Sequence, residues 1–493
     1  MNRRQLLLAA GALPLAGAAH AQTAFGPMRA TGDAAQRLQA RLLRLDEDGL
    51  DPRWYDLPPQ GVEPAPGQLP RAAMQALADL TQGRGNPSAR PDIRRDPAAN
   101  PLQPWVQQLL ESDEPAQVIE RAAAATPDAG PLKAALAAAR TRAGSGGWQP
   151  VPTQGGTLEP WAEDAARVPA LRARLSATDP QLAAQPGSGI TYDQALQAAV
   201  RRFQAAAGLE ADGRIGQATF AALNRPASAQ VQQLRVALDM RRGVAAQHPS
   251  RSVEVNVPDY RLRVMEDGRA ILDMAVVVGR PARATPMMVT RLTAVQFNPP
   301  WGVPHRLAKE DMLPRLRRDP QALVQRGFRI FQRVDGQMVE VDPLTVNWHA
   351  VHPDRFPYVM RQDSGDANAL GRIKFVMPNG DDIFLHDTPE RRLFNRPDRA
   401  HSSGCIRLER PMDLLMMLLE TNQGWNRERV DRVLASGATS SVALARVLPI
   451  RLHYHTVTVD AGQVRMRQDI YGLDEAYHRS MERGRATPVA ARS

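Results

Sequence analysis

The sequence predicts a multidomain α+β protein: an α-helical scaffold and a small helical module, followed by a mostly β domain with a partly helical capping insertion. Three observations support this prediction. The mass of 54.1 kDa exceeds what one ordinary core supports, so two to four domains are expected. Near Arg251 the helical spacing of Ala and Leu gives way to alternating polar and apolar residues. The 41 prolines and 35 glycines predict many loops and linkers.

The first 21 residues have the features of an export signal. Two arginines precede an apolar segment from Leu6 to Ala18, and small residues precede Gln22. Paired arginines occur in Tat and in Sec signals, so the export route stays open. No other apolar run reaches about 18 residues. We expect a signal peptide over 1–21 and a periplasmic protein, unless an uncleaved signal acts as an anchor.

Residues 22–175 are interpreted as an α-helical scaffold with a linker. Helical spacing places Leu38 and Leu42 on one face. The segments with this helical character are Ala34 to Leu45, Trp105 to Leu110 and Ala116 to Ala125. Gly144 to Pro160 is rich in glycine, proline and polar residues, which predicts the linker. We find no catalytic constellation in this region.

A compact helical module is predicted over 180–226. Leu196, Val200 and Phe203 fall on one helical face, and a loop with three glycines separates them from a second helix that ends before Pro226. The string from Val200 to Asn224 resembles the peptidoglycan-binding type 1 module, which implies docking on cell-wall glycopeptide. A helical spacer without binding is the alternative. A connecting helix follows within 227–250.

Residues 251–476 are predicted to form the mostly β domain. The predicted strands are Ser252 to Val257, Arg261 to Met265, Ala270 to Val278, Leu292 to Phe297, Ile373 to Met377 and Ile383 to His386, with a last hairpin from Leu452 to Val459 and Val464 to Arg467. The insertion over 301–357 reads as partly helical, and long insertions are usually functional lids. An apolar core helix runs from Pro411 to Glu420. The tail over 477–493 is expected to be flexible.

The chain is basic, with a net charge of +10 and a pI near 10.3. Lys133, Lys309 and Lys374 are the lysines, so 62 − 3 = 59 of the basic residues are arginine. This charge favours anionic cell-wall polymers or lipid surfaces as partners. It does not indicate nucleic acid, because there is no basic low-complexity arm and no nucleic-acid motif.

Cys405 is the single cysteine of the chain and the candidate nucleophile. An exported protein cannot form an internal disulfide with one cysteine, so chemistry explains this residue better. His386 lies 405 − 386 = 19 positions upstream and is the candidate base. The setting of Ser403 and Gly404 is unlike a buried core cysteine. Backbone N–H groups of Ser403, Gly404 and Cys405 are expected to hold an oxyanion.

His386 is preferred to His401 because a strand end fixes an imidazole more rigidly than a loop does. Its ring is expected to be oriented by a backbone carbonyl, since Asp387 points to the opposite face of the strand. His349 and His352 in the insertion are either substrate contacts or ordinary surface histidines. No metal and no cofactor are expected, because the chain lacks Cys-x-x-Cys and His-Glu-x-x-His spacings.

The segment from Ser402 to Arg407, after His386, resembles the Ser-x-Gly-Cys-x-Arg pattern of the L,D-transpeptidase catalytic domain of the YkuD type. Ser403 stands where many members have histidine. The segment from Gly279 to Pro286 resembles the Gly…Thr-Pro loop of the same family. Three further segments fit the YcbB-like (LdtD-like) subgroup, which has a helical scaffold, a peptidoglycan-binding module and a cap: Asn298 to Pro304, Asn368 to Phe375 and His386 to Pro389.

The resemblance implies that Cys405 attacks a tetrapeptide stem between its third and fourth residues. D-Alanine leaves, and the diaminopimelate amine of a second stem resolves the thioester into a 3→3 cross-link, with His386 as base and acid. It also implies acylation by carbapenems, and peptidoglycan synthases or carboxypeptidases as possible partners. The candidate substrate-binding residues are Ser402, Arg407, Asp387, Thr388, Asn368 and Arg372.

Other outcomes of the same site stay open. An L,D-carboxypeptidase, an amidase that releases wall-bound protein, and attachment of an outer-membrane protein to the wall differ only in the acceptor. A wall-binding scaffold with a vestigial site is an alternative of another class. A papain-like hydrolase is disfavoured, because its cysteine usually precedes its histidine in sequence.

Overall fold

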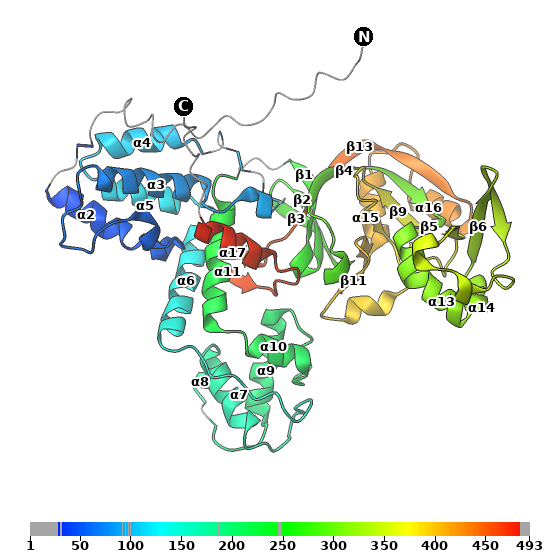
Figure 1. Ribbon diagram of the computed structural model, residues 1–493, viewed down its shortest axis with the longest axis horizontal. Helices are drawn as coiled ribbons and strands as arrows, with labels where there is room; N and C mark the ends of the chain where they lie inside the picture. The colour runs from blue at the N-terminus through cyan, green and yellow to red at the C-terminus, as the bar shows by residue number, and fades with distance from the viewer. Residues whose placement is uncertain are drawn as a thin grey trace, which may run out of the picture. The chain divides into compact units, whose positions relative to one another are not determined.

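The computed structural model describes residues 28–29, 32–90, 92–93, 95–96, 98, 100–185, 187–244 and 249–483. The predicted signal peptide over 1–21 lies outside these residues. The described chain forms two compact units. Figure 1 colours the chain by residue number, from blue at the N-terminus to red at the C-terminus. The first contains the residues before 248, apart from 208–210, and resumes at Thr456; the second contains 208–210 and the chain up to His455.

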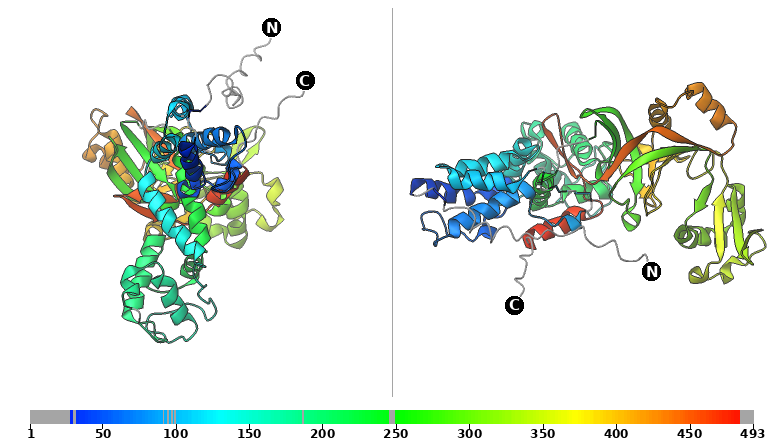
Figure 2. Two further views of the ribbon diagram at one scale, coloured as in Figure 1. Left: turned by 90° about the vertical axis from the view of Figure 1, so that its left-hand side faces the viewer. Right: turned by 90° about the horizontal axis from the view of Figure 1, so that it is seen from above.

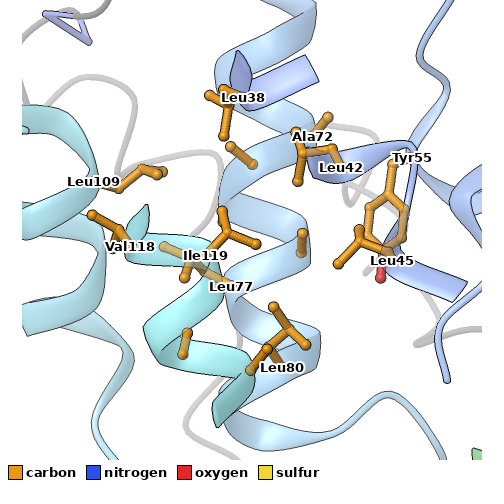
Figure 3. Packing of buried hydrophobic residues seen from close by; sticks show 14 of the residues in the cluster. Leu38, Leu42, Leu45, Tyr55, Ala72, Leu77, Leu80, Leu109, Val118 and Ile119 are labelled. Atoms are coloured by element: carbon orange, nitrogen blue, oxygen red, sulfur yellow. The ribbon is translucent and has the colours of Figure 1, made fainter. Parts of the chain in front are cut away.

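Four helices pack together at the start of the first unit. They are α2 (Asp33–Leu42), α3 (Gln68–Gln82), α4 (Leu102–Glu111) and α5 (Pro115–Ala124). Figure 3 shows their shared core, in which Leu38, Leu42, Leu77, Leu109 and Ile119 are fully buried. The predicted apolar face of the first helix is therefore confirmed.

A second core in this unit joins α7 (Arg167–Ser176), α8 (Pro180–Ala183), α9 (Gln194–Ala207) and α10 (Gln217–Leu223). Leu196 and Val200 are fully buried, as the face of α9 predicts. The structure differs from the expected start at 180, because α7 contributes to this core. The expected linker also contributes: Val151 is buried, and its N–H donates to Asn224 Oδ1 at 2.7 Å.

The last predicted hairpin is displaced from the β domain. It forms β14 (Val457–Asp460) and β15 (Gln463–Met466), which belong to the first unit. This hairpin packs against two helices, α6 (Ala129–Gly144) and α11 (Ala227–Arg241). The two helices run side by side in Figures 1 and 2. Val457 is buried there with Leu132, Leu136 and Leu234, so the predicted domain end at 476 is wrong.

The expected flexible tail over 477–493 is wrong for its first residues, because α17 (Leu473–Arg483) is a helix of the first unit. Tyr477 and Met481 are fully buried against Val236 and Met240. The hydroxyl of Tyr477 donates to Asp239 Oδ2 at 2.7 Å. Residues 484–493 lie outside the described part of the chain.

The second unit is built on a closed ring of strands. The strands are β1 (Arg251–Asn256), β2 (Arg261–Glu266), β3 (Arg269–Gly279), β4 (Met288–Phe297), β9 (Ile373–Val376), β10 (Leu385–His386), β12 (Ile406–Leu408) and β13 (Ser440–His453). Their order is β3-β12-β10-β9-β4-β13-β1-β2, and β2 pairs back to β3. Val253, Val255, Leu262 and Val264 fill the interior, as their alternation predicts. β11 (Ala400–Ser402) pairs with β3 outside the ring.

The strand predicted over Ile383 to His386 contains only its last two residues, because Asp382 takes a positive φ of 54° and Ile383 is bonded to Asn379 of the preceding turn. β13 begins 12 residues before the predicted strand at Leu452 (452 − 440 = 12). The predicted helix from Pro411 is present as α15 (Pro411–Leu419), and its leucines are core residues. None of the helices in the described part of the chain has both the length and the hydropathy that a membrane span requires.

The insertion, residues 301–362 and called the cap below, has a core of its own. It contains β5 (Trp301–Val303), α12 (His305–Leu307), the π-helical turn η6 (Ala308–Met312), α13 (Leu313–Arg318), α14 (Pro320–Gln325), β6 (Phe328–Val334), β7 (Gln337–Val341) and β8 (Tyr358–Gln362). Its strands form a separate sheet, β5-β8-β6-β7, also visible in Figure 2. The insertion was predicted to be partly helical and to end at 357. It extends to Gln362 because β8 pairs with both β5 and β6.

Candidate active site

Cys405 lies on a short turn between β11 and β12. Ser402 braces this turn from inside. Its hydroxyl donates to the carbonyl oxygen of Cys405 at 2.5 Å and accepts from the Gly404 N–H at 3.1 Å. These two hydrogen bonds close a tight turn, which carries a half-buried thiol.

Gly404 allows the turn to form. Its φ of +119° lies in the region that favours glycine, and a Cβ there would stand 3.0 Å from Ile383 Cδ1. Thr285 supports the same residue from the loop after β3, because its hydroxyl donates to the Gly404 carbonyl at 2.8 Å and accepts from the Gly279 N–H at 2.9 Å. The turn is thus fixed from two sides.

Strand register brings His386 and Cys405 to one face of the sheet. β10 and β12 are parallel neighbours, with His386 opposite Arg407 and Leu385 opposite Ile406. Leu385 and Ile406 are fully buried in the barrel. Because side chains alternate along a strand, His386, Arg407 and Cys405 face the other way, and all three line one cleft.

A backbone carbonyl holds the imidazole of His386. Its Nδ1 lies 2.5 Å from the carbonyl oxygen of Asp387, and the residue is only 4 % exposed. A carbonyl only accepts, so Nδ1 carries the proton and Nε2 keeps its lone pair. This is the tautomer that a general base requires, and the prediction that a backbone carbonyl orients the ring is confirmed.

Burial keeps both groups uncharged near neutral pH. The pKa of His386 is held down to about 3, mainly by burial and then by the charge of Arg407, although the carbonyl of Asp387 opposes this. Burial raises the pKa of the Cys405 thiol, while the charges of Lys374 and Arg407 lower it in part. These shifts favour a thiol and a neutral imidazole as the resting pair, in which the imidazole can accept the thiol proton.

Lys374 is a site residue that the sequence analysis missed. On β9 it stands in register with His386, it lines the same cleft, and its Nζ lies 3.5 Å from the centre of the Phe384 ring. Burial lowers the pKa of its ammonium group. The signal in the sequence was a lysine inside the apolar alternation of Ile373 and Phe375.

The cap and the barrel enclose a cleft of about 980 Å³ around Cys405. Trp301, Leu307, Met312 and Phe328 form its apolar wall on the cap side. Its charged lining consists of seven cationic side chains (Arg280, Arg283, Arg306, Arg315, Arg326, Lys374 and Arg407) and four acidic ones (Asp311, Asp381, Asp382 and Glu390). This surplus of positive charge favours a ligand that carries carboxylates.

Three of the candidate substrate-binding residues line the cleft: Ser402, Thr388 and Arg407. Ser402 is buried, and its hydroxyl belongs to the turn. Thr388 is buried and accepts from the Glu390 N–H at 3.2 Å. Arg407 forms an ion pair with Glu390. Arg407 is therefore the candidate best placed to contact a ligand.

The other three candidates, Asp387, Asn368 and Arg372, do not line the cleft and instead brace neighbouring loops. Asp387 Oδ2 accepts from the Arg372 N–H at 3.0 Å, and Arg372 Nε donates to Asn298 Oδ1 at 2.8 Å. Asn368 is buried, and its side-chain amide donates to the Asp363 carbonyl at 2.8 Å. The structure thus gives these residues positions that organise the fold.

The remaining histidines take different places. His401 lines the cleft, and its Nε2 lies 3.0 Å from the Asp398 carbonyl. His349 and His352 are exposed on the cap and do not line the cleft. Across the described residues, no group of three or more His, Cys, Asp or Glu side chains is arranged to hold a metal ion.

Two family models match this chain. Residues 250–424, which include His386 and Cys405, match the L,D-transpeptidase catalytic domain (YkuD). Residues 165–223 match a model described as "Putative peptidoglycan binding domain". The chain is therefore α+β, with a β-rich domain of the YkuD type, helical regions and a helical module that matches the second model.

A curated relative from Haemophilus influenzae, named "Putative L,D-transpeptidase", is 41% identical over 243 residues, which is 49% of this chain and 47% of the relative. The chain thus spans about half the length of the curated relative it matches. Solved L,D-transpeptidases from Mycobacterium smegmatis and Xylanimonas cellulosilytica are 12% and 17% identical. They cover 41% and 62% of this chain and 58% and 98% of their own, each with a TM-score of 0.20.

Proposed function

We propose that this protein is a peptidoglycan L,D-transpeptidase that forms 3→3 cross-links between stem peptides through a thioester on Cys405. The observation that carries this proposal is that Cys405, directly before β12, and His386, on the parallel neighbour β10, line one capped cleft. This cleft belongs to the domain that matches the L,D-transpeptidase family. The cationic lining of the cleft suits a donor and an acceptor that both carry carboxylates.

The first half-reaction follows from the resting protonation states. The Cys405 sulfur attacks the carbonyl carbon between the third and fourth residues of a tetrapeptide stem, and His386 Nε2 takes the thiol proton. The carbonyl electron pair moves to oxygen. When the tetrahedral intermediate collapses, the amine of D-alanine leaves with the proton from His386, and the thioester remains.

In the second half-reaction the side-chain amine of a diaminopimelate in another stem attacks the thioester. His386 accepts a proton from this amine and returns it to the Cys405 sulfur as the bond to the enzyme breaks. Water competes with the amine for the same thioester. The cap covers the cleft with apolar residues such as Trp301 and Phe328, which favours the amine by restricting water.

The helical module over 165–223 is proposed to hold the enzyme on the peptidoglycan, which is thereby its partner as well as its substrate. We also propose a periplasmic location, by Sec or Tat export, from the signal-like residues 1–21. Carbapenem acylation of Cys405 belongs to the same proposal. Membership of the YcbB-like subgroup stays a prediction.

The test is mass spectrometry of purified disaccharide-tetrapeptide incubated with the protein and with its Cys405→Ala and His386→Ala variants. A cross-linked dimer formed by the wild type alone supports transpeptidation with this nucleophile and base. Tripeptide without dimer supports the alternative, an L,D-carboxypeptidase. Release or attachment of wall-bound protein, followed on intact sacculi, distinguishes an amidase or a protein-anchoring enzyme. A wall-binding scaffold would keep its phenotype in Cys405→Ser.

A further inference from the structure

A buried guanidinium stands beside the turn that carries Cys405. Arg283 ends a short 3₁₀ turn after β3, and its side chain is 6% exposed. Its Nη1 donates to Ser403 Oγ at 3.0 Å and to Asp311 Oδ2 at 2.6 Å. Its Nη2 donates to Asp311 Oδ1 at 2.9 Å and to Glu310 Oε2 at 2.5 Å. Asp311 and Glu310 belong to the π-helical turn of the cap, so Arg283 connects the cap to the catalytic turn.

This contact excludes Arg283 as the acceptor of the Ser403 hydroxyl proton. The oxygen of Ser403 accepts from Arg283, and a guanidinium has no acceptor, so the hydroxyl proton must point elsewhere. Within the described chain, Ser403 Oγ donates to no protein group. The residue is exposed, lines the cleft and lies two positions before Cys405. Its O–H is therefore free for a ligand, and the neighbouring positive charge polarises it.

The turn also lacks one of the backbone donors expected for an oxyanion. The N–H of Gly404 is already bonded to the hydroxyl of Ser402 at 3.1 Å. The hydroxyl of Ser402 in turn donates to the Cys405 carbonyl, so it has no proton left for a ligand. Of the two serine side chains of this turn, Ser403 is therefore the one whose hydroxyl proton is not already bonded within the described residues.

We propose that the Ser403 hydroxyl, oriented by Arg283, donates a hydrogen bond to the oxyanion that forms when Cys405 is acylated. In that step sulfur attacks the acyl carbon, the carbonyl π pair moves to oxygen, and the thiol proton passes to His386. Ser403 stabilises the negative oxygen until the leaving group departs. Ser403 is thus a catalytic residue, and Arg283 is a positioning residue that acts through it. The inference rests on the proposed function only in assigning acyl transfer to Cys405.

The test uses p-nitrophenyl acetate, which acylates a thiol through a tetrahedral oxyanion and contains no stem peptide. We expect Ser403→Ala to lower the acylation rate constant by about 10- to 100-fold and Ser403→Thr, which keeps a hydroxyl, to restore most of it. Alkylation of Cys405 by iodoacetamide passes through no oxyanion, so it should stay within about twofold in every variant. This second readout separates a lost donor from a damaged turn.

Arg283→Lys keeps the charge but loses the planar fork, and we expect about a five- to tenfold slower acylation. The double variant Arg283→Lys/Ser403→Ala should be no slower than Ser403→Ala alone, because Arg283 acts through Ser403. Arg329→Lys is the matched control, since Arg329 pairs with Glu340 on the cap hairpin, and it should leave acylation unchanged.

Three results would overturn the proposal: wild-type acylation by Ser403→Ala, a parallel loss of alkylation in that variant, or additive losses in the double variant. A wild-type protein that iodoacetamide alkylates but p-nitrophenyl acetate does not acylate would overturn it too. Failure of the proposed function looks different. In that case the ester acylates Cys405 with the pattern given above, while tetrapeptide stems give neither dimer nor tripeptide.

Discussion

Gly404→Ala tests whether backbone conformation, and not only space, shapes the catalytic turn. The substitution places a Cβ at a residue with φ of +119° and 3.0 Å from Ile383 Cδ1. Holding a non-glycine residue in a sparsely populated region costs about 1–3 kcal/mol. The contact with Ile383 adds less, because the end of that side chain is free to shift by a few tenths of an ångström.

The cost of Gly404→Ala has two measurable consequences. A loss of about 1–3 kcal/mol lowers the melting temperature of a unit of this size by roughly 2–12 °C. The turn relieves its strain by moving, and a displacement of about 1 Å at the reacting atoms lowers the rate about 100-fold. Scanning calorimetry measures the first, and the burst of p-nitrophenolate from p-nitrophenyl acetate measures the second.

Two controls separate the cost of the positive φ from the cost of the contact with Ile383. Ile383→Val removes the Cδ1 atom, so the double variant Gly404→Ala/Ile383→Val relieves the contact but not the strained φ. We expect it to remain as slow as Gly404→Ala. Gly380→Ala, where a Cβ meets open space, should behave as the wild type. Full recovery of acylation in the double variant would refute the reasoning.

Three further predictions concern other parts of the molecule. The rate of Cys405 alkylation by iodoacetamide should keep rising with pH to above pH 9, because burial raises the thiol pKa. Arg407→Gln should shift this pH–rate curve to higher pH, because the charge of Arg407 lowers the thiol pKa. An inflection of the rate between pH 5 and 8 would instead indicate a preformed thiolate–imidazolium pair. Replacing 307–346 of the cap by a short flexible linker should raise hydrolysis relative to cross-linking, measured by mass spectrometry of the products, and an unchanged ratio in a folded variant would contradict this. Tyr477→Phe should lower the free energy of unfolding by about 1–3 kcal/mol in urea titrations, since the buried Asp239 loses a donor; an unchanged midpoint would contradict it.

Local patterns in the sequence predicted much of the fold and the centre of the site. The spacing of Leu38 and Leu42 identified a buried helix face, and the alternation around Val253 identified a barrel strand. The alternation of side chains at His386 and Asp387 also indicated that a backbone carbonyl orients the imidazole. Each of these features depends on a few neighbouring residues, so a single sequence contains the signal.

Features that depend on distant pairing were missed. The cap sheet forms because β8 returns to pair with β5 and β6, and no local pattern specifies such partners. Lys374 enters the cleft only through the register of β9 with β10, and Arg283 meets Ser403 across 120 positions of sequence. The helix that contains Tyr477 did carry a local signal, since Asp474, Tyr477 and Met481 recur at helical intervals.

The discontinuity of the first unit has a consequence for biosynthesis. The core around its helix α11 includes Val236 and Met240 together with Tyr477 and Met481, so part of this core is missing until residues 477–481 have been synthesised. The barrel unit in between consists of 208–210 and of one continuous stretch of chain that ends at His455. We therefore expect the barrel to fold first and the helical unit to close last. A product truncated after His455 would keep its catalytic turn yet leave an apolar helix face uncovered, which makes it a target for proteases that recognise unfinished proteins.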